Sequence, residues 1–224
     1  LTYAYNKNKI KKISNSLREQ NEKNKSDNGV APLPIYEEGQ SLTALKVVPS
    51  AGIDPVTGQE IFIKRDGSYT FTYDPNDKVI FGDTNPFGTG SVNSYLTYKR
   101  FALSCSFLYS FGGSVYNETL ATKVEGANPK YNADERVLND RWKAPGTVAK
   151  YKRIDDTATP YQTSRFVQKN NFLRMSSLSL SYEVPTTFIQ KYGLKRMFLE
   201  LLTNDLFYLS TAKRERGLNY PYDR

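Results

Sequence analysis

Alternation of apolar and polar side chains is strongest between residues 174 and 184, where the chain reads RMSSLSLSYEV. Because successive side chains of a strand point to opposite faces, one face of this segment is apolar and the other carries serines and a glutamate. The segment matches the roughly 9–11 residues with which a strand crosses a bilayer. The pattern therefore predicts a two-faced strand with Leu178, Leu180 and Tyr182 on its apolar face.

A second alternating run occupies residues 101–111 and follows a less regular run at 91–98. We expect the two runs to form an antiparallel hairpin. The polar face of the second run consists mainly of small residues, as is typical of strands that line a lumen. A strand of a β-sandwich with its small side outward would show the same alternation. The apolar face of this run holds Phe101, Leu103, Cys105, Phe107 and Tyr109.

The last part of the chain predicts another strand pair, at residues 172–184 and 197–210, joined by a short basic turn. The final strand alternates poorly, because Leu201 and Leu202 are adjacent and Asp205 interrupts the apolar face. Between the two strand pairs, residues 112–171 are polar and too numerous for a simple connector. Long excursion, strand, short turn and strand thus occur twice, which matches barrels with long loops at one rim and short turns at the other.

Shorter signals complete the pattern. A tight hairpin is expected at residues 60–73, because Asp66-Gly67 supplies the positive φ that such a turn requires. The polar segment 14–29 has no apolar periodicity and is interpreted as a solvated loop. The glycines at 88–90 and 112–113 are interpreted as turns. A short helix is expected at 133–142, with Asn132 as its cap.

Composition argues against catalysis. The 224 residues include no histidine and one cysteine, so the commonest general base and metal ligand are absent, and we expect no catalytic residues, no metal site and no cofactor. The carboxylates near Asp74 fit turn chemistry better than a calcium loop, which would need the glycine and terminal glutamate of an EF-hand. The net charge of +8 is scattered over turns and strand ends, so nucleic acid is not expected as a partner. No run of about 18 apolar residues exists that would predict a membrane-spanning helix.

Several blocks of the chain carry a family resemblance over almost its whole length. These are PLPIYEEGQSLTALKVVPSAGIDPVTGQEIF, YNADERVLNDRWKAPGT, TPYQTSRFVQKNNFLRMSSLSLSYEVP and ERGLNYP. In this order and spacing they resemble the C-terminal part of SusC/RagA-type TonB-linked outer-membrane transporters of Bacteroidetes. Two departures are mild and concern local turn geometry. Lys99-Arg100-Phe101 stands where the family often has Lys-Gly-Phe, and Asp205 stands where Asn is common.

The resemblance implies an all-β fold, an antiparallel transmembrane segment of a 22-stranded barrel with long extracellular loops and short periplasmic turns. Residues 1–224 would be the C-terminal part of that barrel, without the N-terminal plug, the TonB box or the final strand, and residues 112–171 would form a long extracellular loop. The chain starts without methionine and in what resembles the middle of a strand, so we expect a fragment of a longer protein.

The implied function is active import of oligosaccharides or peptides across the Gram-negative outer membrane, driven by TonB, with a SusD-like lipoprotein as lid and membrane lipid around the wall. The alternative is a soluble β-sandwich that binds carbohydrate, in which the apolar strand faces would meet in a closed core. Internal packing of the long loop is the alternative to ligand or lid contact for its aromatic and arginine residues. The candidates for ligand or lid contact are Trp142, Arg141, Tyr131 and Tyr151, and those for lipid-facing or wall-packing residues are Phe101, Leu103, Phe107, Leu178, Leu180 and Tyr182.

Overall fold

The computed structural model describes residues 1–27, 29–128, 130, 134–156 and 158–212, which form two compact units. The sheet unit comprises residues 1–6, 86–113 and 170–211. The loop unit comprises the described residues of 7–85 and 114–169, together with Ala212. Each unit has its own architecture.

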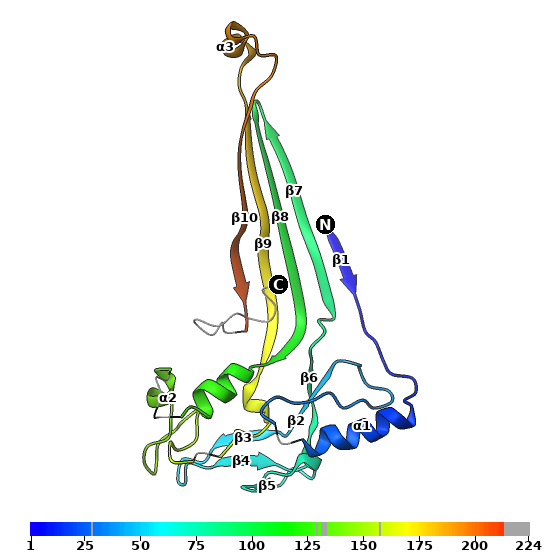
Figure 1. The fold of residues 1–224 in the computed structure, drawn as a ribbon, viewed down its shortest axis with the longest axis vertical. Coiled ribbons are helices and arrows are strands. Elements are labelled where there is room, and N and C mark those ends of the chain that lie inside the picture. The colour runs from blue at the N-terminus through cyan, green and yellow to red at the C-terminus, as the bar shows by residue number, and fades with distance from the viewer. Residues whose placement is uncertain (28, 129, 131–133, 157, 213–224) are drawn as a thin grey trace. The chain divides into compact units, whose positions relative to one another are not determined.

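A five-stranded sheet in the order β1-β7-β8-β9-β10 makes up the sheet unit (Figure 1). The pairs β1–β7, β7–β8 and β9–β10 are antiparallel, so both predicted strand pairs are confirmed. β8 and β9 extend beyond their predicted limits. β1 and β10 are the edge strands. The strands are β1 Thr2–Tyr5, β7 Gly88–Tyr98, β8 Phe101–Tyr116, β9 Val167–Glu183 and β10 Phe198–Ser210.

The connections between these strands are very unequal in length. β7 and β8 are joined by two residues, Lys99 and Arg100, with Lys99 at a φ of 53°. β9 and β10 are joined by a short segment that contains α3, Thr186–Ile189, and η4, Gln190–Tyr192. The connections from β1 to β7 and from β8 to β9 instead supply nearly all of the loop unit. Long and short connections therefore leave from opposite ends of the sheet, as the sequence predicts.

The glycines expected to form turns lie within strands instead. Gly88 and Gly90 belong to β7, and Gly112 belongs to β8. A Cβ on Gly88 would collide with the ring of Phe111, and a Cβ on Gly112 would collide with the ring of Phe87. These glycines make room for aromatic rings on the sheet surface, which is why small residues recur here without a change of chain direction.

The irregular pattern of the last strand corresponds to a β-bulge. The β9–β10 register shifts between Asn204 and Phe207, and Asp205 has a φ of 52°. Its carboxylate pairs with the Nε of Arg174 at 2.9 Å. An extra residue in one strand of a pair reverses the alternation beyond it, which accounts for the break in the apolar face.

The loop unit contains two small antiparallel sheets and several short helices. The predicted hairpin at 60–73 is confirmed as β4 and β5, with Gly67 at a φ of 84°. The sheets consist of β2 Ala44–Val47 with β6 Val79–Asp83, and of β3 Ser50–Ile53, β4 Glu60–Ile63 and β5 Tyr69–Thr70. The helices are α1 Asn15–Ser26, the 3₁₀ turns η1 Pro75–Asp77 and η3 Ser164–Phe166, the π-helical segment η2 Leu120–Glu125, and α2 Arg136–Asn139.

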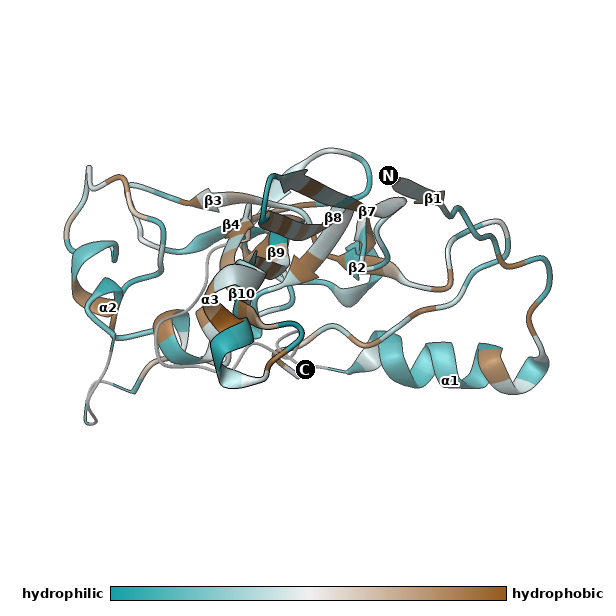
Figure 2. Ribbon diagram, turned by 90° about the horizontal axis from the view of Figure 1, so that it is seen from above, coloured by the Kyte–Doolittle hydropathy of each residue, from teal (hydrophilic) through white to brown (hydrophobic). Residues whose placement is uncertain are grey.

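The prediction of a solvated loop at 14–29 is wrong, because residues 15–26 form α1. The helix begins after Ser14, whose side chain accepts a hydrogen bond from the N–H of Leu17. In Figure 2 the ribbon of α1 is coloured as hydrophilic along most of its length. Its buried contacts are made by Asn21 and Asn24, whose amides donate to the carbonyls of Tyr36 and Pro34 at 2.6 and 2.7 Å. A helix anchored by amides leaves no apolar periodicity for sequence reasoning to find.

A hydrophobic core stabilises the loop unit. Its members come from η2, α2, η3 and the chain near residue 151, so the core joins the two halves of the long β8–β9 connection. The short helix expected at 133–142 is confirmed only in its middle part, as α2, while its expected cap, Asn132, lies outside the described residues. The core residues are Leu120, Ala121, Val124, Val137, Tyr151 and Phe166.

Candidate functional site

The six residues predicted to be lipid-facing or wall-packing lie on one face of the sheet unit. In the β7–β8 register Phe107 is opposite Val92, and Leu103 is opposite Leu96. The rings of Phe101 and Tyr182 contact each other with centroids 4.7 Å apart, which places Tyr182, and with it Leu180 and Leu178, on the same face. Phe101 is 49% exposed and Leu180 41% exposed, so this face is not sealed inside a core.

The opposite face of the same strands is polar. It carries the serines that alternate with the apolar residues of β8 and β9. Ser106 donates to the amide oxygen of Asn93 at 2.6 Å, and Ser179 donates to Glu200 at 2.6 Å. Some of the polar side chains on this face are thus hydrogen-bonded to side chains of neighbouring strands. The sheet has one apolar and one polar side.

Aromatic rings mark both ends of the apolar face. At the end with the short turn lie Tyr98, Phe101 and Tyr182. At the other end the ring of Phe111 stacks with those of Tyr3 and Tyr109, both with centroids 6.1 Å away, and packs edge-on against Phe87 at 5.2 Å.

The distance between the two aromatic groups matches the thickness of a membrane. Phe111 lies ten residue steps beyond Phe101 in β8, or roughly 34 Å at about 3.4 Å per step. A strand tilted by 35–45° would cover about 24–28 Å of membrane over that length, close to the apolar band of roughly 25 Å in outer-membrane barrels. The side chains between the aromatic groups include Val92, Leu96, Leu103, Cys105, Phe107, Leu178 and Leu180.

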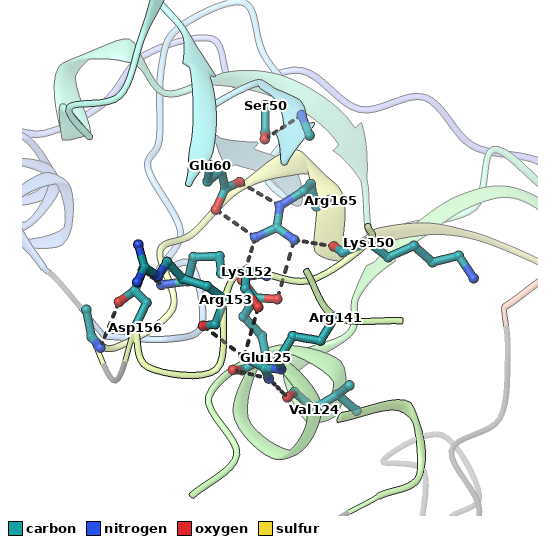
Figure 3. A network of polar contacts seen from close by, with 12 residues as sticks. Ser50, Glu60, Val124, Glu125, Arg141, Lys150, Lys152, Arg153, Asp156 and Arg165 are labelled. Carbon is teal, nitrogen blue, oxygen red and sulfur yellow. Dashed lines mark hydrogen bonds and ion pairs between the residues drawn. The ribbon is translucent and has the colours of Figure 1, made fainter. Parts of the chain in front are cut away.

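Arg141, a candidate for ligand or lid contact, is buried at 4% exposure. Its guanidinium donates to five backbone carbonyls at 2.6 to 3.4 Å, and burial lowers its pKa (Figure 3). The contacts join η2, α2 and the segment at residues 152–153, so Arg141 holds three pieces of the loop together. The accepting carbonyls belong to Val124, Glu125, Val137, Lys152 and Arg153.

A second buried arginine, Arg165, bridges two carboxylates that the sequence analysis did not single out. Its guanidinium pairs with both oxygens of Glu60 at 2.7 Å and with Glu125 at 2.9 Å (Figure 3). Burial acts to lower the pKa of Arg165, but the ion pairs with Glu60 and Glu125 outweigh it and raise that pKa. These residues lie 105 and 40 positions from Arg165 in the chain, so no local spacing signal reveals them.

The remaining candidates are Trp142, Tyr151 and Tyr131. The indole N–H of Trp142 donates to the carbonyl of Pro55 at 2.9 Å, and its ring lies against Gly58, where a Cβ would clash. Tyr151 is 5% exposed within the hydrophobic core. Tyr131 lies outside the described residues. Ligand or lid contact by these residues stays a prediction, and the burial of Arg141 and Tyr151 favours internal packing for those two.

The acidic residues near Asp74 have ordinary turn partners. Asp74 accepts from the N–H of Asn76 at 2.8 Å, and Asp83 accepts from the hydroxyl of Thr43 at 2.5 Å. Across the described ranges, no three or more His, Cys, Asp or Glu side chains are grouped so as to hold a metal ion. No helix in those ranges combines the length and the apolar character needed to cross a membrane.

Comparison with known proteins gives one sequence relative and several related structures. No family model matches the chain. It is 32% identical over 154 residues to the TonB-dependent receptor P3 of Formosa agariphila, which covers 67% of this chain and 14% of that receptor.

The structural similarity extends further along the chain. The structure of the RagAB peptide transporter superposes with a TM-score of 0.68 at 20% identity, over 79% of this chain and 20% of the RagAB chain. The open-open state of the RagAB peptide importer gives a TM-score of 0.67 at 20% identity, over 81% of this chain and 20% of that chain. The chain thus spans 14% of the receptor from Formosa agariphila and 20% of each RagAB chain, whose fold it shares. By its sequence similarity to the former, it belongs to the TonB-dependent receptors.

Proposed function

We propose that this chain forms part of the wall and outer loops of an outer-membrane β-barrel that imports nutrients. In this proposal the apolar face of the sheet unit contacts lipid and its serine-rich face lines the interior of a 22-stranded barrel. The observation that carries it is the exposed apolar band between two groups of aromatic rings. Trp and Tyr side chains concentrate at membrane interfaces because they combine an apolar ring with a polar group.

The lengths of the strand connections indicate which end of the sheet would face the periplasm and which would face outward. Outer-membrane barrels have short periplasmic turns and longer extracellular loops. The turn at Lys99 and Arg100 would then face the periplasm, and the loop unit, which contains the long loop expected at 112–171, would face outward. Import would draw energy from TonB through parts of the protein outside this chain, with a SusD-like lipoprotein covering the outer opening and an oligosaccharide or a peptide as cargo.

Within the loop unit, Trp142 is the best remaining candidate for contact with cargo or lid. It is half-buried, whereas Arg141 and Tyr151 are buried. Arg153 lies over its ring with 5.8 Å between the guanidinium carbon and the ring centroid. An aromatic ring with an adjacent arginine suits both sugar faces and protein interfaces.

The second candidate function is carbohydrate binding by a soluble β-sandwich, which would require the apolar face of the sheet to be buried. Its apolar face would have to pack against a second sheet. The described residues of the sheet unit form a single sheet, and Phe101 and Leu180 remain exposed on it. These two observations favour the barrel wall.

The chain's single cysteine allows a direct test, because Cys105 lies on the apolar face of β8. We expect Cys105 of the full-length protein in outer membranes to resist a charged, water-soluble maleimide and to react with an apolar one. The matched control moves the thiol by one residue, as Cys105→Ser combined with Ser106→Cys, which places it on the serine-rich face. That thiol should react with the water-soluble reagent. Equal labelling of both positions by the charged reagent, or recovery of the protein without detergent, would refute the barrel wall.

A further inference from the structure

A small cavity in the loop unit has an unusual excess of positive charge. It lies between α1 and η1 and has a volume of about 120 Å³. Its wall contains four basic side chains and a single carboxylate, that of Glu37. Such a lining attracts anions. The basic residues are Lys25, Lys46, Arg65 and Lys78.

Lys78 has a buried ammonium group that lacks a partner in the described part of the chain. It is 4% exposed, and its ammonium has no hydrogen-bond partner among the described residues. Removing an ammonium from water without a partner is costly, so buried lysines are normally paired. Burial lowers the pKa of Lys78, opposed in part by the charge of Asp27. An anion in the cavity would supply the missing partner.

The neighbouring cations are only partly neutralised. Lys46 pairs with Glu37 at 2.6 Å, and Lys25 pairs with the exposed Glu22 at 2.8 Å. The guanidinium of Arg65 donates to the backbone carbonyl of Lys78 at 3.3 Å and has no carboxylate among the ion pairs of the described residues. The cavity therefore contains two cations, Arg65 and Lys78, that no described carboxylate neutralises by direct pairing.

The size of the cavity limits what can enter it. A volume of about 120 Å³ equals roughly four waters at about 30 Å³ each, and it is well below the 300–1,000 Å³ of sites for drug-sized ligands. One small charged group fits, whereas a whole sugar chain or peptide does not. Carboxylate, sulfate and phosphate groups each offer several acceptor oxygens to lysine and arginine.

From these observations we propose that the cavity between α1 and η1 binds an oxyanion group, with Lys78 and Arg65 as its principal partners. The group is a carboxylate, sulfate or phosphate, either free or carried on a larger molecule whose remainder stays outside. This proposal does not depend on nutrient import, because binding is measured on the protein itself.

The test measures anion binding to the full-length protein in detergent by thermal unfolding and calorimetry. Sodium sulfate, phosphate and acetate are compared with sodium chloride at equal ionic strength, so that nonspecific screening cancels. We expect saturable stabilisation by at least one oxyanion, and the comparison of acetate with sulfate and phosphate identifies the preferred group. A response to no oxyanion beyond that to chloride would overturn the proposal.

Variants assign the effect to the cavity. Lys78→Met should weaken binding by about tenfold or more, the factor expected when a charge-assisted hydrogen bond is lost. It should not destabilise the anion-free protein, because it removes an unpaired buried charge. Arg65→Gln, at an exposed position, should weaken binding independently. Lys64→Met removes an exposed lysine outside the cavity lining and should bind as the unmodified protein does. Equal losses in Lys64→Met and Lys78→Met would refute the site.

Discussion

The two units of this chain bury their apolar side chains in opposite ways. Among the described residues, the buried apolar side chains lie in the loop unit, with Ile189 as the exception. The sheet unit exposes large apolar residues along its strands, including Leu96, Leu180 and Leu201. A soluble domain hides such residues from water, whereas a membrane wall presents them to lipid. The contrast is the one that the proposed membrane wall requires, with apolar side chains buried in the loop unit and exposed on the sheet unit.

The units also differ in where they place charge. In the loop unit, Glu60, Glu125 and Arg165 form a buried ion network, and Arg141 satisfies five carbonyls. In the sheet unit the ion pairs are more exposed, as for Arg196 with Glu183, whose side chains are 67% and 40% exposed. Buried pairs are strongly coupled to folding, while exposed pairs contribute little. Substitutions of the same kind should therefore have unequal effects in different environments.

The largest effect is expected from Arg165→Met. It leaves Glu60 and Glu125 as buried carboxylates without their shared cation, so the loop unit should lose about 3–5 kcal/mol of stability. The measurement is protease resistance of the full-length protein as a function of denaturant. Arg18→Met is the control, because its pair with Glu38 is exposed and contributes about 0–1 kcal/mol. Similar losses in both variants would remove the distinction between buried and exposed charge.

A somewhat smaller effect is expected from Leu178→Arg in the middle of the apolar band. An arginine on the lipid face near the bilayer centre costs about 2–4 kcal/mol. The neighbouring variant Ser177→Arg places the same side chain on the polar face and should be tolerated. The fraction of folded protein in outer membranes, followed by heat-dependent mobility on gels, compares the two. If Ser177→Arg were the more damaging variant, the assignment of faces would be reversed.

The smallest effect concerns an ion pair at the loop surface. Hydrogen bonds from the side chain and the backbone N–H of Arg136 lower the pKa of Asp134 to about 2. Because the folded pKa lies below the unfolded value, the stabilisation is present above about pH 4 and is lost as pH falls towards 2. Asp134 is 33% exposed, so solvent screening limits the contribution to less than about 1 kcal/mol.

Acid titration of unfolding in Asp134→Asn and in the unmodified protein tests this expectation. The difference in stability between the two proteins should shrink as the pH falls from about 4 to about 2. A difference that stayed constant over that interval would mean that the carboxylate of Asp134 is not selectively stabilised in the folded protein.

The sheet unit was largely predictable from the sequence because alternation reports directly on strand faces. The runs around Leu103 and Leu180 identified two strands, and the disturbance at Asp205 marked a real bulge. The interpretation of the glycines of β7 and β8 as turns is wrong, because the sequence alone does not distinguish a glycine that accommodates an aromatic ring from one that forms a turn. Which ring lies over which glycine is decided across strands.

The loop unit was less predictable because its structure depends on contacts between distant residues. Helix α1 is held by Asn21 and Asn24 rather than by an apolar stripe. Arg141 is a candidate for ligand or lid contact, with internal packing as the alternative, and only the folded chain reveals that it binds backbone carbonyls inside the loop unit. Arg165 and its carboxylates gave no signal at all. The residues of such polar interiors do not recur at a regular spacing along the sequence, so they can be identified only from the folded structure.

The short first strand has a practical consequence. β1 pairs with residues 88–91 of β7, so beyond them the side of β7 that faces away from β8 has no partner strand in the described sheet, and neither has the outer side of β10. Unsatisfied strand borders recruit whatever β-structure is nearest, including other copies of the same polypeptide. Expressed by itself in water, the segment should therefore accumulate as insoluble, cross-paired material. Work on Trp142 or Lys78 should accordingly start from the full-length protein.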